Sequence, residues 1–391
     1  MSRAGDLARH YSRFRVADRL LLTGHSHQAW PDVARDAILE AYDDAALAVD
    51  EKWGRAQQRA ERLRDGVRAL LGDPGAAVAL GANTHELVVR FLSALDLRTR
   101  PRLVTTDGEF HSARRQLDRL AETGLEVVKV PARPVATLAE RLAAAVDDRT
   151  AAVVVSSVLF ETSQLVPGLD GVAAACARTG TELLVDAYHQ LGVVPLSVHE
   201  AGLTDAWVVG GGYKYLQLGE GNCFLRLPPH ADGLRPVITG WYAEFGDLSG
   251  SAAGTVAYAR GSDRFAGSTY DPTSHYRAAR VLDFFAEQGL TPPRLREISL
   301  HQRGLLADAF DDLDLPAELV TRDRETPADG FGGFLTLFTA QAARLQAALA
   351  ECGVLTDSRG PHLRFGPAPY LTDEQLTEAM GMLGEVAAGT R

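Results

Sequence analysis

Three short apolar runs and a glycine-rich turn with one lysine follow one another in residues 182–227, which read "ELLVDAYHQLGVVPLSVHEAGLTDAWVVGGGYKYLQLGEGNCFLRL". The runs "ELLVD" (182–186), "AWVVG" (206–210) and "NCFLRL" (222–227) are mostly continuous apolar stretches rather than alternating ones. Such runs are typical of strands that are covered by helices on both faces. The segment therefore predicts the middle of a buried, mainly parallel sheet.

The same pattern extends upstream along the chain. Amphipathic helical segments lie between most of the runs, for example "THELVVRFLSAL" (84–95) and "GLDGVAAACARTG" (168–180). This alternation predicts an α/β fold with a mainly parallel seven-stranded sheet covered by helices, which binds ligands beyond the carboxyl ends of its strands. The four upstream strand candidates are "AAVAL" (76–80), "RLVTT" (102–106), "EVVKV" (126–130) and "AAVVVSS" (151–157).

Lys214 lies in the glycine-rich stretch "GGGYKYLQLGEG" (210–221). A phosphate-binding P-loop requires Gly-x-x-x-x-Gly-Lys-Ser/Thr at the start of a helix, and Tyr215 follows the lysine here, so we exclude that motif. A solvated lysine in a surface turn stays possible, and Asp186 at a strand end is by itself often only a helix cap. Together, however, an Asp at one strand end and a Lys one strand later are what a pyridoxal phosphate site needs. The carboxylate keeps the pyridine nitrogen protonated, and the lysine forms a Schiff base.

The composition is that of an ordinary globular protein, and its 391 residues suffice for two domains. The net charge of −11 argues against nucleic acid or an anionic membrane as a partner. No apolar run approaches the length of a membrane span, and "MSRAGDLARHYSRFRV" (1–16) has no apolar signal core, so we expect a cytoplasmic location. Cys176, Cys223 and Cys352 are too few and too scattered for a disulfide framework or a zinc site.

A helix start follows the first strand candidate. In "GANTHEL" (81–87), Asn83 is a good N-cap and Thr84 opens the helix. The free amides and the dipole of a helix N-terminus form an anion site, but any helix start has them. The stretch alone is therefore weak support for phosphate binding.

With these residues in place, the chain resembles the pyridoxal-phosphate enzymes of the aminotransferase class V group (fold type I), and within it the kynureninases most closely. The resemblance spans nearly the whole chain. Any one of the shared motifs is a weak signal, whereas their common order is specific for the family and less so for the substrate. The stretches that carry it are "VVVSSVLFETSQLVPGLDGV" (153–172), "DAYHQLGVVPLSVHEAGLTDAWVVGGGYKYL" (186–216), "TGWYAEF" (239–245), "GSTYDPTSHYRA" (267–278) and "LRFGPAPYLT" (363–372).

For catalysis with pyridoxal 5'-phosphate, the resemblance implies roles for three residues. Lys214 would form the Schiff base and later move the proton at Cα, and Asp186 would pair with the pyridine nitrogen. Tyr213 would lie near the cofactor and reach its phosphate.

Other positions would hold the cofactor. Phe110 would stack on the pyridine ring, and His111 is the alternative stacking residue. Phe110 could instead be an ordinary aromatic residue of the core. The remaining positions that the resemblance assigns to the cofactor are Asn83 and Thr84 at the phosphate, Ser112, Ser156 and His189.

The resemblance also implies a homodimer with active sites completed by both subunits. Trp241 and Asp271 would reach the phosphate region from the neighbouring subunit, although Trp241 could instead be a core aromatic. Arg364 would hold the α-carboxylate of an amino-acid substrate by a bidentate pair. As an ordinary alternative, Arg364 in the strand candidate "HLRF" (362–365) could form an edge ion pair.

The chain departs from the family pattern on the substrate side. The stretch "TGHSHQAWP" (23–31) resembles an active-site segment, with His25 and Ser26 at substrate positions, but His25 and His27 replace the family's Asn and Leu. Two histidines without a third ligand do not indicate a metal, and we expect none. "VDEKWG" (49–54) lacks a histidine that kynureninases carry before the Trp, and Asp271 replaces an asparagine. The cofactor chemistry is therefore a safer prediction than the substrate.

We expect an N-terminal segment over 1–48 that joins the small domain, a large cofactor-binding domain over 49–274 and a smaller α+β C-terminal domain over 275–391. Its strand candidates are "FLTLF" (334–338), "VLTD" (354–357) and "HLRF" (362–365).

The expected function is kynureninase-like hydrolytic cleavage of a Cβ–Cγ bond that releases alanine. Alternatives with the same cofactor are a β-lyase, a decarboxylating or C–C bond-forming enzyme, or a biosynthetic aminotransferase; a non-catalytic cofactor-binding regulator is the other class. A cysteine desulfurase needs a nucleophilic cysteine on a mobile loop, and none of the three cysteines fits.

Overall fold

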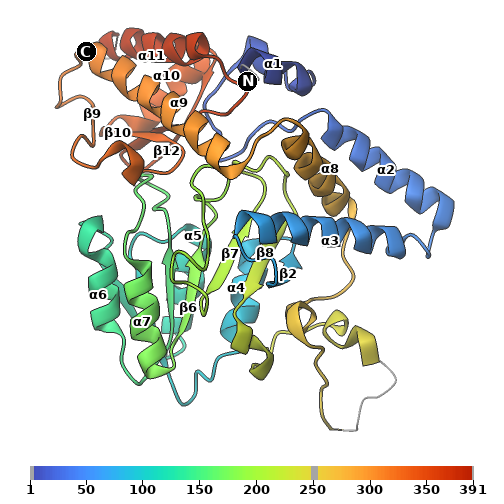
Figure 1. The fold of residues 1–391 in the computed structure, drawn as a ribbon. Coiled ribbons are helices and arrows are strands. Elements are labelled where there is room, and N and C mark those ends of the chain that lie inside the picture. The colour runs from blue at the N-terminus through green and yellow to red at the C-terminus, as the bar shows by residue number, and fades with distance from the viewer. Residues whose placement is uncertain (1–3, 248–253, 390–391) are drawn as a thin grey trace.

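The central sheet has seven strands in the order β2-β8-β7-β6-β5-β3-β4, in a computed structural model that describes residues 4–247 and 254–389 (Figure 1). All neighbouring strands are parallel except β8, which runs antiparallel to β2 and β7. The predicted seven-stranded, mainly parallel sheet is thereby confirmed. Its strands are β2 (Ala77–Gly81), β3 (Arg102–Thr106), β4 (Glu126–Val130), β5 (Thr150–Ser156), β6 (Glu182–Asp186), β7 (Trp207–Gly211) and β8 (Cys223–Leu227).

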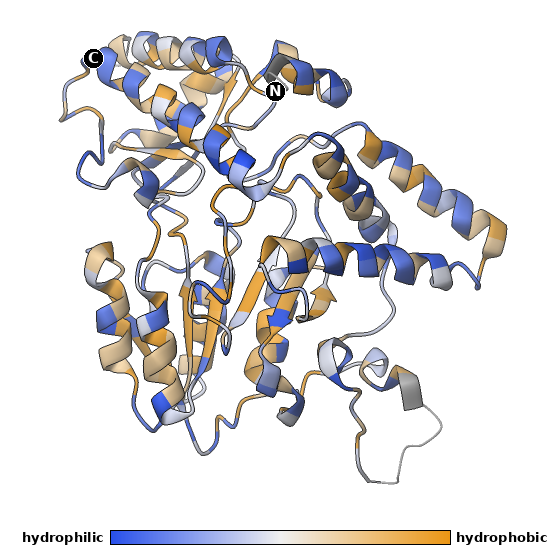
Figure 2. Cartoon of the chain, in the orientation of Figure 1, coloured by the Kyte–Doolittle hydropathy of each residue, from blue (hydrophilic) through white to orange (hydrophobic). Residues whose placement is uncertain are grey.

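The continuous apolar runs form these strands because both faces of the sheet are buried. In β5, Val153 and Val155 belong to one hydrophobic core, and Ala152 and Val154 belong to the core on the opposite face. Successive side chains of a strand point to opposite faces, so a strand between two cores must be apolar at every position. Figure 2 shows the strands as the most hydrophobic part of the chain, between helices with one hydrophilic side.

Two sets of helices cover the sheet. Helices α4 and α5 contribute to one core, whereas α3, α6 and α7 contribute to the other. Asn83 caps α4 as predicted, because its side-chain oxygen accepts a hydrogen bond from the backbone N–H of Glu86. The bounds are α3 (Trp53–Leu70), α4 (Thr84–Ser93), α5 (His111–Ala121), α6 (Leu138–Ala145) and α7 (Leu169–Thr179).

A smaller α+β unit from the C-terminal part of the chain lies above the carboxyl ends of the central strands (Figure 1). Its antiparallel sheet has the order β12-β13-β10-β9, and β11 pairs separately with β1 from the N-terminal segment. The predicted strand over 354–357 is thus divided between β11 and β12. The elements are β1 (Leu20–Leu21), β9 (Thr321–Arg322), β10 (Leu335–Phe338), β11 (Val354–Leu355), β12 (Asp357–Arg359), β13 (His362–Phe365), α9 (Pro292–Asp312), α10 (Ala342–Glu351) and α11 (Asp373–Ala388).

The remaining helices join these parts. Helix α8 (Thr273–Glu287) packs against α2 (Val33–Ala48) and α3, so the expected boundary after residue 274 falls in its first turn. The expected division into domains stays a prediction. Residues 1–3, 248–253 and 390–391, which it includes, lie outside the residues that the structure describes. No helix among the described residues is long and apolar enough to span a membrane. The other helix is α1 (Ala4–Ala8), and the short 3-10 helices are η1 (Arg9–Tyr11), η2 (Val16–Asp18), η3 (Val135–Thr137), η4 (Pro229–Gly233), η5 (Trp241–Asp247), η6 (Gly261–Phe265) and η7 (Ala328–Gly330).

Candidate active site at Lys214

Neighbouring parallel strands bring the predicted lysine and aspartate to the same edge of the sheet. Asp186 is the last residue of β6, and Lys214 follows β7 by three residues. Ser156 ends β5 and is paired in register with Asp186. These side chains therefore lie at the carboxyl ends of the strands, where open α/β sheets bind ligands.

The glycines before Lys214 allow a close approach of the chain rather than a phosphate cradle. A Cβ atom at Gly211 would lie 2.5 Å from the Tyr188 hydroxyl and 2.6 Å from the Cys223 sulfur. A Cβ atom at Gly212 would lie 2.5 Å from the Leu218 side chain. Only residues without a side chain fit here, and the backbone can then turn so that Lys214 points back into the protein.

Lys214 is buried, with only 6% of its surface exposed, so the solvated-lysine alternative does not hold. Its Nζ lies 2.6 Å from Nε2 of His189, 4.7 Å from the ring centre of Tyr188 and 5.3 Å from that of Phe110. Burial lowers the pKa of Lys214 to about 7, although the nearby Asp186 carboxylate opposes this shift. A substantial fraction of the amine is therefore unprotonated, and nucleophilic, at neutral pH.

His189 accompanies the lysine as a second uncharged nitrogen group. Burial and the Lys214 charge lower the pKa of His189 well below its usual value. Neutral His189 can accept a hydrogen bond from Lys214 at Nε2, which assigns its proton to Nδ1. Among the described residues, the buried Nδ1 has no hydrogen-bond partner. A bound group with an acceptor oxygen or ring atom would satisfy this donor.

Asp186 is half-buried and faces the same space. Its Oδ1 accepts the backbone N–H of Tyr188 at 2.9 Å. Burial raises the pKa of Asp186, whereas this hydrogen bond and the Lys214 charge lower it. A carboxylate in such surroundings is stabilised by a cationic partner, and a protonated pyridine ring would be one.

Glu109 is a buried acid of this site that the sequence analysis missed. One oxygen accepts the Thr106 hydroxyl at 2.7 Å and the Ser156 N–H at 3.2 Å, and the other lies 2.6 Å from the Ser156 hydroxyl. Burial raises the pKa of Glu109 to about 7, and the Asp186 charge adds to the shift. Its position beside Phe110 was the only signal in the sequence, because a single acid in a turn does not reveal its burial.

The aromatic residues at the site distinguish the two candidate stacking residues. Phe110 lies over Lys214, while His111 is exposed at the start of α5 and contacts Phe110 and Phe160. Ser112 lies one residue further along the same helix. Phe110 is therefore the better placed of the two to stack on a ligand held by Lys214.

The N-terminus of α4 approaches the site through β8. The Thr84 amide interacts with the thiol of Cys223, which lies 3.9 Å from the hydroxyl of Tyr188. Tyr188 packs on Tyr213 at 4.8 Å between ring centres, and burial raises the pKa of Tyr213 to about 12. The Tyr213 ring centre lies 5.7 Å from Nζ of Lys214, and the expected binding of a phosphate by the helix start and Tyr213 stays a prediction.

The two histidines of the N-terminal segment go to different places. His27 stacks on Tyr213 at 4.8 Å between ring centres, next to Ser26, whereas His25 is fully buried and contacts Asp357 through Nε2 at 2.8 Å. Among the described residues, no three His, Cys, Asp or Glu side chains are grouped so that they could hold a metal ion.

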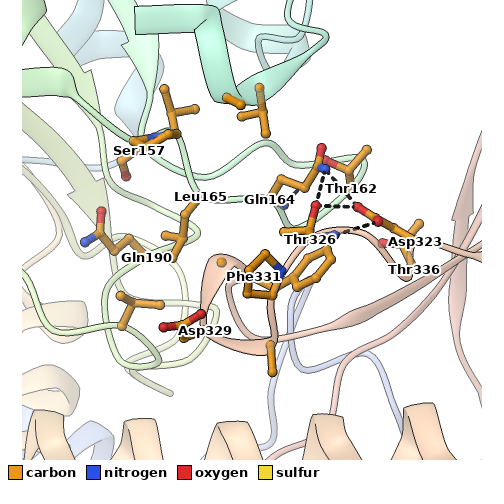
Figure 3. Close-up of a pocket in the computed structure, with 18 of the residues that line it drawn as sticks. Ser157, Thr162, Gln164, Leu165, Gln190, Asp323, Thr326, Asp329, Phe331 and Thr336 are labelled. Atoms are coloured by element: carbon orange, nitrogen blue, oxygen red, sulfur yellow. Dashed lines mark hydrogen bonds between the residues drawn. The ribbon is translucent and has the colours of Figure 1, made fainter.

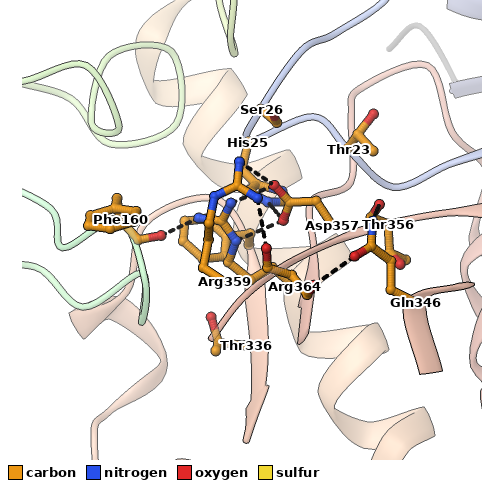
Figure 4. A network of polar contacts seen from close by, with 12 residues as sticks. Thr23, His25, Ser26, Phe160, Thr336, Gln346, Thr356, Asp357, Arg359 and Arg364 are labelled. Carbon is orange, nitrogen blue, oxygen red and sulfur yellow. Dashed lines mark hydrogen bonds and ion pairs between the residues drawn. The ribbon is translucent and has the colours of Figure 1, made fainter. Parts of the chain in front are cut away.

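Arg364 forms a buried ion pair with Asp357, a residue that the sequence analysis did not single out (Figure 4). Its Nε and Nη2 donate to the two carboxylate oxygens at 2.8 and 2.5 Å, and its Nη1 donates to the carbonyl of Phe160. The ordinary alternative, an ion pair, is therefore present. The expected role of Arg364 in holding a substrate carboxylate stays a prediction.

Trp241 and Asp271 are not brought to Lys214 of the same chain. The Trp241 indole donates to the Thr269 hydroxyl at 3.3 Å and is 42% exposed, so it is not a core aromatic. Asp271 accepts hydrogen bonds from the backbone and side chain of Thr273, which lower its pKa. Both residues are exposed, and their expected role at a subunit interface stays a prediction.

The cysteines do not provide a nucleophile at this site. Burial raises the pKa of Cys176 and of Cys223 to about 12, so both are protonated at neutral pH. Cys352 is exposed at the C-terminal end of α10.

A large cavity of about 1820 Å³ lies beside the site, between the large and small units (Figure 3). Ser157, Gln190 and Phe331 line it, together with the hydrogen-bonded group of Gln164 and Asp323. Lys214 and Asp186 are not among its lining residues. We place the candidate active site at Lys214 because the reactive amine, the strand-end carboxylate and the aromatic rings meet there.

No family model matches the chain, but individual proteins do. The chain is 25% identical over 371 residues to the uncharacterized aminotransferase YcbU of Bacillus subtilis (strain 168). The aligned region covers 95% of this chain and 94% of that protein. It is 26% identical over 345 residues to the kynureninase of Bacillus cereus (strain ATCC 10987 / NRS 248), which covers 83% of this chain and 77% of the enzyme.

Solved structures share the fold. A C-DES mutant with glycine covalently linked to its pyridoxal phosphate cofactor has a TM-score of 0.83 at 18% identity, over 96% of this chain and 98% of that one. The apo cysteine desulfurase from Thermococcus onnurineus NA1 has a TM-score of 0.80 at 16% identity, over 98% of both chains. The chain is therefore similar in sequence to kynureninases and to an aminotransferase, as expected, and it has the fold type I architecture of a cystine C–S lyase and of cysteine desulfurases.

Proposed function

We propose that the protein is a pyridoxal-phosphate-dependent enzyme of the aminotransferase class V type, with Lys214 as the residue that carries the cofactor. The observation that carries the proposal is the buried Lys214 amine, which has a pKa of about 7 and lies 2.6 Å from His189. The similarity to kynureninases and an aminotransferase, and the fold shared with a pyridoxal-phosphate-linked lyase, support the same cofactor.

The residues around Lys214 fit this cofactor. Asp186 would hold the ring nitrogen, Phe110 would cover one face of the ring, and the unpaired Nδ1 of His189 would donate to the bound group. When bound, pyridoxal phosphate supplies an electron sink that stabilises negative charge on the substrate carbon next to the amine. The phosphate would bind at the start of α4, near the hydroxyl of Tyr213.

The side chains then have distinct tasks. Lys214 takes the proton from the Cα atom of the substrate and returns it at another atom, which requires an amine that is uncharged near neutral pH. His189 orients the lysine through the contact at Nε2. Asp186 would stay ionised and keep the ring nitrogen protonated. The positive charge of the ring is what lets it withdraw electrons from the substrate.

For the reaction itself we propose kynureninase-like cleavage of a Cβ–Cγ bond, in which water adds to a γ-carbonyl group and alanine is released. The kynureninase similarity over 83% of the chain supports this reaction. Desulfurase chemistry is less well supported, because Cys176 and Cys223 are buried with raised pKa values and Cys352 lies at a helix end.

Transamination is the second candidate. The similarity to the uncharacterized aminotransferase covers 95% of the chain, more than the kynureninase similarity does. The substrate-side changes at His25 and Asp271 also separate this chain from the kynureninase pattern. In this case Lys214 would move the proton between Cα and the cofactor without cleavage of a carbon–carbon bond.

The cofactor assignment is tested by borohydride reduction of the purified protein and peptide mapping. The chain has only three lysines, Lys52, Lys129 and Lys214, so the labelled peptide gives an unambiguous answer. We expect the label on Lys214, its loss in Lys214→Ala and its retention in the control Lys129→Ala. A label on Lys52 or Lys129 in the wild-type protein would contradict the proposal.

The reaction is tested with protein that has not been reduced with borohydride, once the cofactor has been located on Lys214. A panel of amino acids is added that includes kynurenine and 3-hydroxykynurenine. Cleavage yields alanine and an aromatic acid, whereas transamination yields an oxo acid and the amino form of the cofactor. Alanine released from kynurenine supports the first candidate. An oxo acid without alanine supports the second.

A further inference from the structure

Lys214 lies in a short loop whose ends are joined by a hydrogen bond. The backbone N–H of Leu218 donates to the carbonyl of Gly212 at 2.8 Å, and within the loop the N–H of Gln217 donates to the carbonyl of Lys214 at 3.1 Å. Gln217 has a φ of 58°, which lies in the left-handed region. The loop that presents Lys214 therefore depends on a left-handed residue at position 217.

This conformation is unfavourable for a glutamine, because the Cβ atom comes too close to the following carbonyl oxygen. A glycine would adopt the same conformation without strain. A residue with a side chain persists in it only where the surrounding structure holds it there. The side chain of Gln217, which is fully buried, must therefore make contacts that offset the strain.

Two side chains of the N-terminal segment bind the amide group of Gln217. Its Oε1 accepts the Tyr11 hydroxyl at 2.5 Å, and its Nε2 donates to Oε1 of Gln28 at 2.8 Å. The shorter distance is typical of an O–H···O bond and too short for N–H···O, so the amide oxygen faces Tyr11. Burial and the neighbouring Tyr370 raise the pKa of Tyr11 well above its usual value, so the hydroxyl keeps its proton and remains a donor.

Gln28 and Gln217 also hold the two peptide groups on either side of Lys214. The backbone N–H of Gln28 donates to the carbonyl of Tyr213 at 3.4 Å, and that of Gln217 donates to the carbonyl of Lys214. Because the two glutamines bind each other through their side chains, these contacts form a closed ring around the backbone of Lys214. A rotation of the Lys214 backbone would have to break at least one of them.

The N-terminal segment is itself anchored to the C-terminal part of the chain. The ring centres of Tyr11 and Tyr370 lie 4.7 Å apart, and the backbone N–H of Ala29 donates to the Tyr370 hydroxyl at 3.1 Å. Both tyrosines are buried, with only 1% of their surface exposed. The contacts that hold the Lys214 loop are therefore fixed at their far end as well.

We propose that Gln217 is a positioning residue, which uses its hydrogen bonds to Tyr11 and Gln28 to hold the amine of Lys214 inside the buried site. The N-terminal segment then contributes to the site through Tyr11 and Gln28 without either residue contacting the substrate. The proposal rests on the proposed function in that it takes Lys214 as the reactive residue. A core glutamine without this role would stabilise the fold and leave the amine unaffected.

The protonation of the Lys214 amine reports its position. Burial lowers its pKa to about 7, and an amine that moves toward water recovers a higher pKa. In cofactor-free protein, acetylation by acetic anhydride over a series of pH values, followed by peptide mapping, gives the midpoint for Lys214. Lys52 and Lys129 are internal references, and their labelling should be the same in every variant.

The substitutions that test the proposal leave the charged and titratable groups around this amine unchanged. These groups are Asp186, His189, Tyr213, Asp357, Arg359 and Arg364. A shift of the midpoint would therefore report a change in the position of Lys214 rather than the loss of a neighbouring charge.

Gln217→Gly removes the side chain and also relieves the strain of the backbone. We expect it to raise the midpoint for Lys214 by about one pH unit or more, because the amine is less well desolvated. Tyr11→Phe keeps the ring and removes one hydrogen bond, so it should give a smaller shift in the same direction. In the double variant Tyr11→Phe should add nothing to the shift, since its partner is already absent.

Asp314→Gly is the matched control. Asp314 also has a left-handed φ, of 45°, and is exposed just beyond the end of α9. Its replacement relieves the same kind of backbone strain far from the loop and should leave the midpoint for Lys214 unaltered. An equal shift in Asp314→Gly and Gln217→Gly would contradict the proposal.

An unshifted midpoint in Gln217→Gly would also overturn the proposal. Where thermal unfolding shows that this variant does not fold, Tyr11→Phe decides alone, because its midpoint must lie above that of the wild type. These measurements use protein without cofactor and are thus independent of the borohydride test. A shifted midpoint together with no cofactor on Lys214 would refute the proposed function and retain Gln217 as the residue that holds this amine.

Discussion

The Nζ atom of Lys214 lies 2.6 Å from Nε2 of His189, and both side chains are buried. Burial lowers the pKa of both, to about 7 for the lysine and well below the usual value for the histidine. Two nitrogen groups that would repel each other when charged are thus held together because both lose their charge readily. A lysine in this state is ready to react with a carbonyl group at neutral pH.

The reactivity of Lys214 should therefore depend on pH in a defined way. In protein freed of cofactor, we expect covalent attachment of added pyridoxal phosphate, fixed by reduction, to increase as pH rises through about 7. In the urea-unfolded chain the same increase should occur near the ordinary lysine value of about 10.4. Peptide mapping at each pH measures both curves, and coincident curves would contradict the burial argument.

The same shift affects stability. Between about pH 7 and 10.5 the unfolded chain keeps a proton on Lys214 and the folded cofactor-free protein does not. The contribution of this residue to the free energy of unfolding therefore increases with pH in that window. Lys214→Met should lose this dependence, as urea unfolding of the two proteins at pH 7 and pH 9.5 would measure.

Asp186 should influence both the lysine and the chemistry. Its charge raises the pKa of Lys214 against the larger effect of burial. In Asp186→Asn the midpoint of Lys214 labelling should therefore move to lower pH. Exchange of the substrate Cα proton should slow by several orders of magnitude, since a charge-assisted partner in a buried site is lost. Normal exchange in this variant would mean that another acid holds the ring nitrogen.

Glu109 should weaken the folded protein as pH rises. Burial raises its pKa from 4.5 to about 7, so between these values the folded state holds a proton that the unfolded chain has released. Stability from this residue is complete below about pH 4.5 and is lost as pH rises to 7. Glu109→Gln stays neutral at every pH. Its free energy of unfolding should therefore rise relative to that of the wild type by a few kcal/mol between pH 5 and pH 8, which is the energy equivalent of the pKa shift.

Thermal or urea unfolding of Glu109→Gln and wild type at the two pH values measures this difference. Glu122→Gln, on the exposed end of α5, is the matched control and should show no such gain. A constant difference between Glu109→Gln and wild type across this range would show that Glu109 is ionised in the folded protein.

Gly211→Ala should destabilise the site by roughly 1–3 kcal/mol, because the new Cβ atom would lie 2.5 Å from the Tyr188 hydroxyl and 2.6 Å from the Cys223 sulfur. Cofactor retention should fall as well, since Tyr188 contacts Lys214. Gly75→Ala is the control, because a Cβ atom there meets nothing within 4 Å. Equal unfolding free energies for the two variants would show that the backbone around position 211 moves to accommodate the Cβ atom without loss of stability.

The exposed apolar side chains predict where a dimer forms. Tyr42 and Leu47 on α2 are 72% and 76% exposed, and Val237 and Trp241 are also exposed, at 79% and 42%. Contiguous exposed apolar groups mark contact surfaces, and Tyr42 and Leu47 lie on the same helix. We expect a dimer in sedimentation velocity that Tyr42→Glu combined with Leu47→Lys turns into monomers with poorer cofactor retention. Asp43→Asn is the control on α2, and a wild-type monomer would contradict the prediction.

The strands of the central sheet could be predicted from the sequence because their signal is local. A strand buried on both faces must be apolar throughout, and each predicted run lies within one residue of an observed strand. The proximity of Lys214 and Asp186 was predictable for a related reason: residues at the carboxyl ends of adjacent parallel strands must lie near each other. Hydrophobic pattern and strand order together were sufficient for these predictions.

The tertiary structure alone decided the rest. The run 354–357 divides because Val354 and Leu355 pair with β1, more than 300 residues earlier in the chain, whereas Asp357 joins β13. Glu109 and Asp357 look like ordinary surface acids in the sequence, and only the packing of distant segments buries them beside Ser156 and Arg364. Burial and ionic pairing depend on contacts between segments far apart in the chain, whereas periodicity depends on near neighbours, so the sequence determined the scaffold and the three-dimensional packing determined which charges act in the site.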